Sequence, residues 1–332
     1  MRKRLYIYKK YYYLCHVDFK IIIINTTKSM GKILIIGSSN TDLIATTKRF
    51  PAPGESIVGS GFYTAMGGKG ANQAIAALRL GGDVSFVASL GTDVNGQTAL
   101  EYYKQQGLDV SMSLIVDGVS SGTAVIWVNE TGENSIVYIP GANNKLSPEY
   151  IQGLEDVIKS AGMLVLQMEI PYETVSAICK MAQKYGRKVM LNVAPARKVD
   201  EEFLQAVEIL VVNETEAEII TGRKLEENNI EEMVDFLLSM GPKVVLLTLG
   251  EKGCFLKTGS EKYIVPAFKV SPVDTTAAGD TFCGAVAAEY MRGKSWNEIL
   301  KFASAAAAIS VTRMGAQPSI PTQSEVEQFL NS

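Results

Sequence analysis

Residues 163–169, MLVLQME, and residues 188–194, KVMLNVA, are two apolar runs that flank a stretch with helical spacing. In that stretch, Val175, Ile178 and Met181 recur every three residues. A strand, a helix and a second strand in this order predict a parallel pair joined by a crossover helix. Both runs are apolar almost throughout, which is typical of strands buried on both faces. This part of the chain therefore predicts an α/β fold.

The same pattern continues on both sides of this stretch. Four more apolar runs read KILIIGS, VSFVASLG, ILVVNE and KVVLLTLG, at residues 32–38, 84–91, 209–214 and 243–250. Residues 71–78 have apolar side chains at helical spacing, and Ser295 with Glu298 forms a capping-box pattern at the start of a late helix. We therefore expect a three-layer α/β/α domain with a mostly parallel central sheet and helices on both faces.

Two regions interrupt this alternation. Residues 54–66 and 119–141 have an extended pattern, and the second contains TAVIWVNETGENSIVYI, whose central NETGEN predicts a hairpin turn. We expect a small β-sheet that projects from the main domain as a lid, with segments at about 40–66 and 119–141. No repeat or linker-like segment follows Met30, so we interpret residues 30–332 as one domain with this lid.

Residues 1–29 differ in composition from the rest of the chain. They contain seven Lys or Arg against one Asp, and five of the fourteen tyrosines. Lysines interrupt any apolar core of a signal peptide, and no small-residue cleavage site follows. We expect an atypical extension that is disordered or produced by an upstream start codon, with a peripheral strand or helix as the alternative.

Charge and hydropathy favour a small-molecule partner. The chain has 332 residues and a formal net charge of -3, which gives no electrostatic reason to expect nucleic acid or an anionic membrane. The apolar runs are far shorter than the roughly 20 residues that span a bilayer. The four cysteines, at positions 15, 179, 254 and 283, have no metal-binding or redox spacing and are consistent with the cytoplasm.

The single histidine, His16, lies in the N-terminal extension. If this extension is dispensable, the chemistry must proceed without histidine. Catalytic triads, histidine zinc sites and histidine general bases are then excluded. The chain also has neither the G-x-G-x-x-G nor the P-loop pattern, which argues against a Rossmann dehydrogenase and a P-loop nucleotidase.

The first candidate motif is VDTTAAGDTFCGA, at residues 273–285. Small residues precede Asp280 at the start of an apolar helical pattern, so a phosphate could approach the backbone of Ala277, Ala278 and Gly279. A carboxylate aimed at an anion site suggests a base that deprotonates a hydroxyl group beside the transferring phosphoryl group. A simple helix cap is the alternative role of Asp280.

The second candidate motif is MGGKGANQA, at residues 66–74. Its glycines would let a polyol lie close to the backbone, while Lys69 and Asn72 could donate to sugar hydroxyls. Asp42, at the C-terminal end of the first strand, could accept from them, because ligands of open α/β sheets bind at strand ends. Glu169 closes a later strand and could be a further acceptor or a carboxylate at the rim. A glycine-rich loop with a solvated lysine is the alternative.

Taken together and in this order, GGKGANQA, NETEAE and DTTAAGDTF resemble the ribose-phosphorylating members of the PfkB family of carbohydrate kinases. The resemblance extends from Lys32 to Leu330. It implies ATP-dependent phosphorylation of D-ribose at the 5-hydroxyl, giving ribose 5-phosphate and ADP, with Mg²⁺ and an activating K⁺ as cofactors. It also implies a cytoplasmic homodimer whose contact is formed by the β lid.

The resemblance assigns roles to individual residues. It places Asp280 as the base, with the N–H groups of residues 277–280 holding the developing charge. The implied ribose contacts are Asn40, Asp42, Gly68, Lys69, Asn72, Glu169 and Asp280. The implied ATP contacts are Asn213, Thr248, Leu249, Gly250, Glu251, Lys252, Gly253, Gly279 and Ser304. Glu216 would position Mg²⁺ through water, and K⁺ would be held by Asp274, Thr276, Ser310, Arg313, Gly315 and Ser319, mostly through backbone oxygens.

Ser304 departs from the family pattern, because histidine is frequent at this position. A kinase of the same family for deoxyribose, fructose, a keto-deoxy sugar acid or a nucleoside is an alternative. Asp42 and the GGKGAN motif argue against the sugar acid, whose carboxylate would favour an arginine. A further alternative is a catalytically idle sugar-binding protein, although such a protein needs no base.

Overall fold

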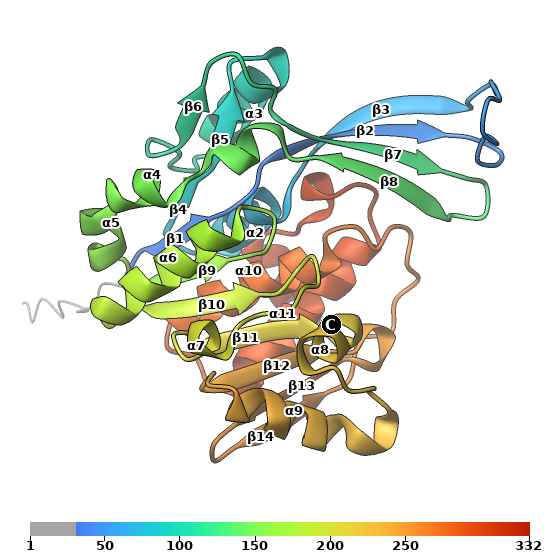
Figure 1. Cartoon of the computed structure of the whole chain (residues 1–332). Helices are drawn as coiled ribbons and strands as arrows, with labels where there is room; N and C mark the ends of the chain where they lie inside the picture. The colour runs from blue at the N-terminus through green and yellow to red at the C-terminus, as the bar shows by residue number, and fades with distance from the viewer. Residues whose placement is uncertain (1–30) are drawn as a thin grey trace, which may run out of the picture. The chain divides into compact units, whose positions relative to one another are not determined.

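The computed structural model describes residues 31–332, which form one compact unit. The predicted extension at residues 1–29 lies outside the described residues. An eight-stranded sheet runs through the centre of this unit in the order β14-β13-β12-β11-β10-β9-β1-β4 (Figure 1). Its strands in chain order are β1 Ile33–Ile36, β4 Val84–Val87, β9 Met163–Leu166, β10 Lys188–Asn192, β11 Ile209–Asn213, β12 Val244–Thr248, β13 Cys254–Thr258 and β14 Lys262–Val265.

All strand pairs from β4 to β12 are parallel, while β13 and β14 form an antiparallel edge. The prediction of a mostly parallel central sheet is confirmed. The antiparallel edge was not predicted. In the structure β13 follows β12 after only a short turn that contains η3, Gly250–Lys252. A connection of that length cannot provide the crossover that a parallel pair requires.

Neighbouring residues of the central strands pack into two different cores. In β1, Ile33 and Ile35 belong to one core, and Leu34 and Ile36 belong to the other. The first core is covered by α2 Lys69–Arg79, α3 Val94–Gln105, α10 Ala278–Met291, α11 Trp296–Val311 and α12 Gln323–Leu330. The second is covered by α4 Pro148–Gln152, α5 Glu155–Ser160, α6 Tyr172–Lys184, α7 Glu201–Leu204, α8 Glu214–Thr221 and α9 Ile230–Ser239. This is the predicted three-layer arrangement.

Helices α2 and α10 approach each other closely at Gly284. A Cβ added to Gly284 would lie 2.5 Å from the Cβ of Ala76 and 2.7 Å from the backbone nitrogen of Ala77. Only glycine allows this approach. Asp280 lies one helical turn before Gly284, so the same contact brings Asp280 against the first turn of α2.

A second sheet has the order β3-β2-β7-β8 and extends away from the central sheet (Figure 1). Its strands are β2 Asn40–Thr46, β3 Gly61–Gly67, β7 Gly122–Val128 and β8 Asn134–Ile139. The turn predicted at NETGEN joins β7 to β8 as an antiparallel hairpin. The extended segment predicted at residues 54–66 is only partly a strand, because β3 begins at Gly61.

The run VSFVASLG is divided between two sheets. Its first part is β4, and its second part is β5, Ser89–Gly91, which pairs with β6, Leu114–Val116, in a two-stranded sheet. Two further 3-10 turns, η1 at Gly141–Lys145 and η4 at Gln317–Ser319, approach the site described below, and a third, η2 at Glu227–Asn229, precedes α9. No helix within residues 31–332 is long and apolar enough to cross a membrane.

Candidate active site

Asp280 lies in the first turn of α10. Ala277, the residue before α10, has a left-handed backbone with φ 59°, and Thr281 N–H donates to its carbonyl at 2.8 Å. Ala278 N–H donates to the Thr275 carbonyl at 3.3 Å. Within residues 31–332 no side chain caps this helix, and a Cβ at Gly279 would meet no described atom within 4 Å. The N–H groups of residues 279 and 280 are therefore open to an anion.

Two amide side chains from α2 hold the carboxylate of Asp280. Asn72 Nδ2 donates to Oδ2 at 3.0 Å, and Gln73 Nε2 donates to Oδ1 at 3.0 Å. Asp280 is only 6% exposed. Asn72 was a predicted site residue, whereas Gln73 was missed, although it lies in the quoted GGKGANQA motif.

Asp42 lies on β2 of the second sheet, six residues after the end of β1, and not at the end of the first strand itself, where the sequence analysis had placed it. Gly67 is its neighbour, and a Cβ there would lie 2.3 Å from Asp42 Oδ2. Asp42 is 9% exposed, and no N–H or O–H group of the described residues donates to its carboxylate. Burial, together with the charges of Glu169 and Asp280, raises the pKa of Asp42 to about 7. A carboxylate on a largely buried residue without a protein donor indicates a site for a hydroxylated ligand.

Lys69 is the first residue of α2 and follows Gly68, whose φ of 90° favours glycine. Among residues 31–332, its ammonium group has no carboxylate within 4.0 Å. The charge of Asp280, with smaller contributions from Glu169 and Glu216, raises the pKa of Lys69 above its ordinary value despite burial. Lys69 therefore stays protonated and can donate to a ligand.

Glu169 is engaged with the protein. Its Oε2 accepts hydrogen bonds from the Ser38 hydroxyl at 2.6 Å and from Lys69 N–H at 3.0 Å. The carboxylate thus stabilises the start of α2, where acidic groups are favoured. Its other oxygen has no donor in the described part of the chain and could accept from a ligand, as the sequence analysis predicted.

Asn40 faces Asn143, a residue that the sequence analysis missed. Asn143 Nδ2 donates to Asn40 Oδ1 at 2.8 Å, and Asn143 Oδ1 accepts from Ser39 N–H at 3.0 Å. Asn143 is fully buried in η1. Its place just after the predicted hairpin, in GANN, was the only available signal.

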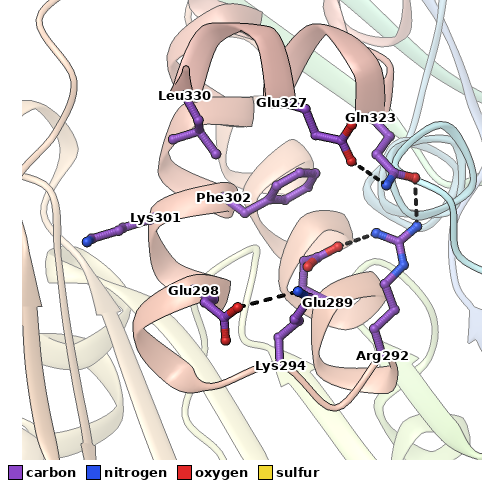
Figure 2. A pocket seen from close by; sticks show the side chains of 9 residues that line it. All are labelled: Glu289, Arg292, Lys294, Glu298, Lys301, Phe302, Gln323, Glu327 and Leu330. Carbon is purple, nitrogen blue, oxygen red and sulfur yellow. Dashed lines mark hydrogen bonds and ion pairs between the residues drawn. The ribbon is translucent and has the colours of Figure 1, made fainter. Parts of the chain in front are cut away.

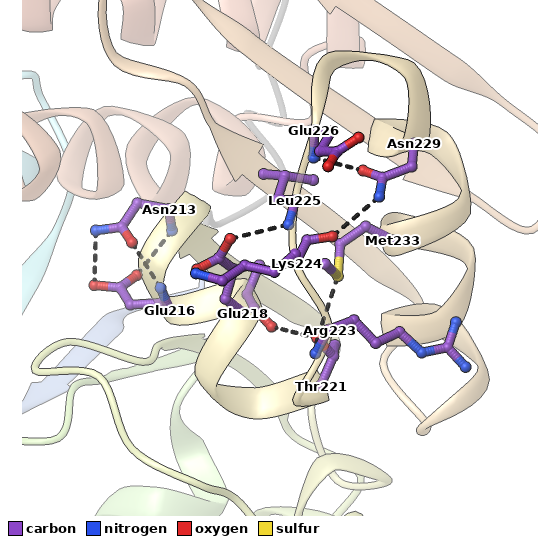
Figure 3. Close-up of polar contacts among 11 residues, drawn as sticks. Asn213, Glu216, Glu218, Thr221, Arg223, Lys224, Leu225, Glu226, Asn229 and Met233 are labelled. Atoms are coloured by element: carbon purple, nitrogen blue, oxygen red, sulfur yellow. Dashed lines mark hydrogen bonds and ion pairs between the residues drawn. The ribbon is translucent and has the colours of Figure 1, made fainter.

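Asn213 and Glu216 form a capping box at the start of α8 (Figure 3). Glu216 N–H donates to Asn213 Oδ1, while Asn213 donates to both carboxylate oxygens of Glu216, at 2.8 and 3.1 Å. Burial, opposed by these hydrogen bonds and by Lys69, raises the pKa of Glu216 to about 7. Within residues 31–332 no group of three or more His, Cys, Asp or Glu side chains gathers as a metal site. The remaining lone pairs of Glu216 fit a contact to Mg²⁺ through water.

The predicted nucleotide segment lies beside this capping box. Thr248, the last residue of β12, is in register with Asn213 at the end of β11. The following loop includes η3 and ends at Gly253, whose φ of 100° favours glycine. The predicted ATP residues Thr248, Leu249, Gly250, Glu251, Lys252 and Gly253 are therefore contiguous with Asn213. Ser304 lies 3.9 Å from the sulfur of Cys254, just beyond this loop.

The predicted potassium residues come from two neighbouring loops and the end of α11. Asp274 accepts hydrogen bonds from Thr276 N–H at 2.9 Å and from Gly315 N–H at 2.8 Å, which joins the two loops. The Arg313 guanidinium donates to Glu325 at 2.6 Å, so this side chain is engaged elsewhere. Ser310 and Ser319 are buried, and their hydroxyls donate to backbone carbonyls.

A hollow of about 450 Å³ lies at the opposite end of α10 (Figure 2). It is lined by charged side chains around Phe302 and Leu330, with Arg292 paired to Glu289. Asp280 and the hollow are separated by the length of the helix, and no predicted site residue lines the hollow. It is therefore separate from the candidate active site.

The geometry combines an open helix N-terminus, a carboxylate held beside it, and an adjoining polar site with a carboxylate and an ammonium group that lack protein partners. Such a site can bind a hydroxylated ligand and transfer a phosphoryl group to it, which defines a phosphotransferase of the three-layer α/β/α class. The profile of the family described as pfkB family carbohydrate kinase matches residues 30–323. The chain belongs to this family, as its three motifs predicted.

Individual relatives agree with this assignment. The chain is 40% identical to a ribokinase of Haemophilus influenzae over 299 residues, covering 90% of this chain and 98% of that protein. It is 36% identical to a deoxyribokinase of Salmonella typhi, covering 90% and 98%. A solved structure of Arabidopsis thaliana ribokinase complexed with ribose and ATP is 34% identical, with a TM-score of 0.86 and coverage of 91% and 99%.

Proposed function

We propose that this protein phosphorylates D-ribose at the 5-hydroxyl with ATP, giving ribose 5-phosphate and ADP. The observation that carries this proposal is the buried Asp42 carboxylate without a donor, in the same site as Asp280 at the open end of α10. A sugar hydroxyl would supply the missing donor. The relatives named ribokinase support ribose as the sugar.

In the proposed reaction, Asp280 accepts the proton of the ribose 5-hydroxyl as that oxygen attacks the γ-phosphorus of ATP. The bond between the γ-phosphorus and the β,γ-bridging oxygen breaks, and ADP leaves. The open N–H groups of residues 279 and 280, in the segment Ala277–Asp280, stabilise the charge on the transferring group. Lys69 and Asn72 donate to the sugar, while Asp42 and Glu169 accept from it. Asn40 and the backbone at Gly68 complete the sugar site.

The nucleotide would lie along Asn213, the 248–253 loop, Gly279 and Ser304. Bound Mg²⁺ would neutralise charge on the phosphates, and Glu216 would orient its water ligands. K⁺ would be held at the 274–276 and 310–319 segments by Asp274, Thr276, Ser310, Arg313, Gly315 and Ser319. Because Asp274 joins these loops just before α10, an ordered cation there would steady the start of that helix.

We also propose a homodimer formed through the second sheet. In the register of this sheet, Asp42, Ala65 and Ala124 share the face that contains the sugar site. The opposite face presents Phe62 at 68% and Val137 at 59% exposure. A second copy would cover this apolar face. We place the protein in the cytoplasm, where ATP is available and where its buried free cysteines remain reduced.

The test is ATP-dependent phosphorylation by a protein that starts at Met30, with Mg²⁺ and K⁺ present and with ribose, deoxyribose and fructose as acceptors. Preference for ribose is expected. It would also support residues 30–332 as the functional domain and residues 1–29 as dispensable. No turnover of any sugar by the folded protein would contradict the proposal and favour the idle sugar-binding alternative.

Asp280→Asn separates catalysis from binding in the same assay. Loss of a general base should lower kcat by about 10²- to 10⁴-fold with little change in ribose affinity. Weaker ribose binding with unchanged kcat would contradict the role of Asp280. Deoxyribose is the second candidate substrate, because a deoxyribokinase has similar identity to this chain. Faster turnover of deoxyribose than of ribose would make deoxyribose the substrate and would leave the proposed mechanism unchanged.

A further inference from the structure

Each oxygen of the Asp280 carboxylate is held by an amide, and each of those amides is held in turn by a buried glutamine. Gln167 Nε2 donates to Gln73 Oε1 at 2.8 Å, and Gln317 Nε2 donates to Asn72 Oδ1 at 3.1 Å. Gln167, Gln73 and Gln317 are all fully buried. Two amide chains therefore converge on one carboxylate, from the end of β9 and from η4.

The direction of the first chain is fixed by Asn192. Its Nδ2 donates to the backbone carbonyl of Val211 at 3.3 Å, and a carbonyl can only accept. Asn192 must then present Oδ1 to Gln73, which donates to it at 3.1 Å. With Gln73 Nε2 facing both Asn192 and Asp280, Oε1 faces Gln167. A rotated Gln73 amide would place its oxygen against the oxygens of Asn192 and Asp280, and its nitrogen against Nε2 of Gln167.

Gln73 uses both amide hydrogens and its amide oxygen within the protein. Because it is fully buried, it has no access to a sugar or a nucleotide. Gln167 Oε1 has no hydrogen-bond partner among the described residues, so this buried amide is incompletely satisfied. An apolar side chain of the same length would avoid that deficit. The amide pair therefore points to a role exerted on Asp280.

We propose that Gln73, supported by Gln167, is a positioning residue that fixes the orientation of the Asp280 carboxylate. This inference rests on the proposed function, because it assigns Asp280 to the reaction. Asn72 cannot provide the fixation alone, since it holds only one oxygen and faces the sugar site. Without Gln73, the carboxylate can rotate about its last side-chain bond, and the oxygen lone pair that accepts the proton no longer stays aligned with the sugar hydroxyl.

The test uses Gln73→Met, which keeps the length of the side chain and removes the donor, with Gln167→Met as the second variant. The matched control is Gln97→Met, at an exposed position in the first turn of α3. For Gln73→Met, kcat should fall about 10- to 100-fold, the scale of a small misplacement of a reacting group, while the KM for ribose changes by less than about threefold. Gln167→Met should give a smaller fall in kcat, and Gln97→Met none.

An unchanged kcat in Gln73→Met, or a change confined to KM, would overturn the inference. If Gln73→Met does not fold, Gln167→Met decides by the same criterion. The crystal structure of the folded variant gives a readout that does not depend on turnover: the Asp280 carboxylate should lose its single orientation. A wild-type protein without kinase activity would overturn the proposed function, and the carboxylate orientation would still decide this inference.

Discussion

In the sugar-free protein, the free energy of unfolding of Asp42→Asn should increase relative to that of the wild type as pH rises. Burial raises the pKa of Asp42 from 3.8 in its ordinary state to about 7 in the folded protein. Below pH 3.8 the carboxyl is protonated in both the folded and the unfolded chain. As pH rises toward 7, the unfolded chain releases this proton and the folded protein keeps it, so the free energy of unfolding falls. Asparagine does not ionise and lacks this dependence.

The magnitude follows from the two pKa values. At about 1.4 kcal/mol for each pKa unit, the full cost of ionising Asp42 in the folded protein is about 4 kcal/mol above pH 7. About 3 kcal/mol of this cost develops between pH 5 and pH 8.5. The new amide also lacks a partner, which costs about 1–3 kcal/mol at every pH. The quantity to measure is therefore how the difference in the free energy of unfolding between Asp42→Asn and the wild type changes with pH.

Urea unfolding at pH 5 and at pH 8.5, without sugar, measures this difference. Asp93→Asn is the matched control, because hydrogen bonds from Ser121 and Gly96 lower the pKa of Asp93 despite its partial burial. The stability that Asp93 provides is lost only as pH falls below about 4, because its pKa is 3.8 in the unfolded chain and lower in the folded protein. The Asp93→Asn difference in the free energy of unfolding should therefore be the same at pH 5 and at pH 8.5. If the difference for Asp42→Asn does not change with pH, or falls as pH rises, the raised pKa of a buried Asp42 carboxyl in the sugar site is refuted.

Three further outcomes are expected. Gly284→Ala should lower stability by about 1–3 kcal/mol, because the new Cβ meets α2; a differential scanning melt unchanged from wild type would contradict the close contact. Lys69→Met should raise the KM for ribose far more than it lowers kcat, and steady-state kinetics with varied ribose would measure the split. Turnover should be faster in potassium than in sodium buffer at equal ionic strength, and equal rates would exclude the proposed cation site.

The apolar runs were enough to predict the layers, because strands buried on both faces require continuous apolar residues. They could not predict the antiparallel edge, since β13 has half-buried positions, β14 has exposed ones, and their pairing depends on a short turn. The division of VSFVASLG into β4 and β5 was also missed. Both halves are buried, so apolar character could not distinguish one strand from two.

The candidate site was predictable where a motif places unusual residues together. Asp280 and Lys69 stand beside glycines and small residues, which carry a local signal. Gln73 and Asn143 also lie beside small residues, in GGKGANQA and GANN, but their roles could not be predicted, because a buried amide resembles an exposed one in sequence until its partners are known. Gln167 is still less visible, since its contact to Gln73 joins positions 94 residues apart.

The second sheet is anchored unequally along its length. Its strand β2 begins four residues after β1, and the connecting Ser39 is pinned by Asn143 and by the Tyr103 hydroxyl at 2.7 Å. At the other end, residues 48–49 and 129–134 are exposed or half-buried. The sheet is therefore held at the end beside the proposed sugar site and is less constrained at its other end. Bending would be concentrated toward the tip, and amide exchange along β2 should quicken from Asn40 to Thr46, while Asp42 keeps its place.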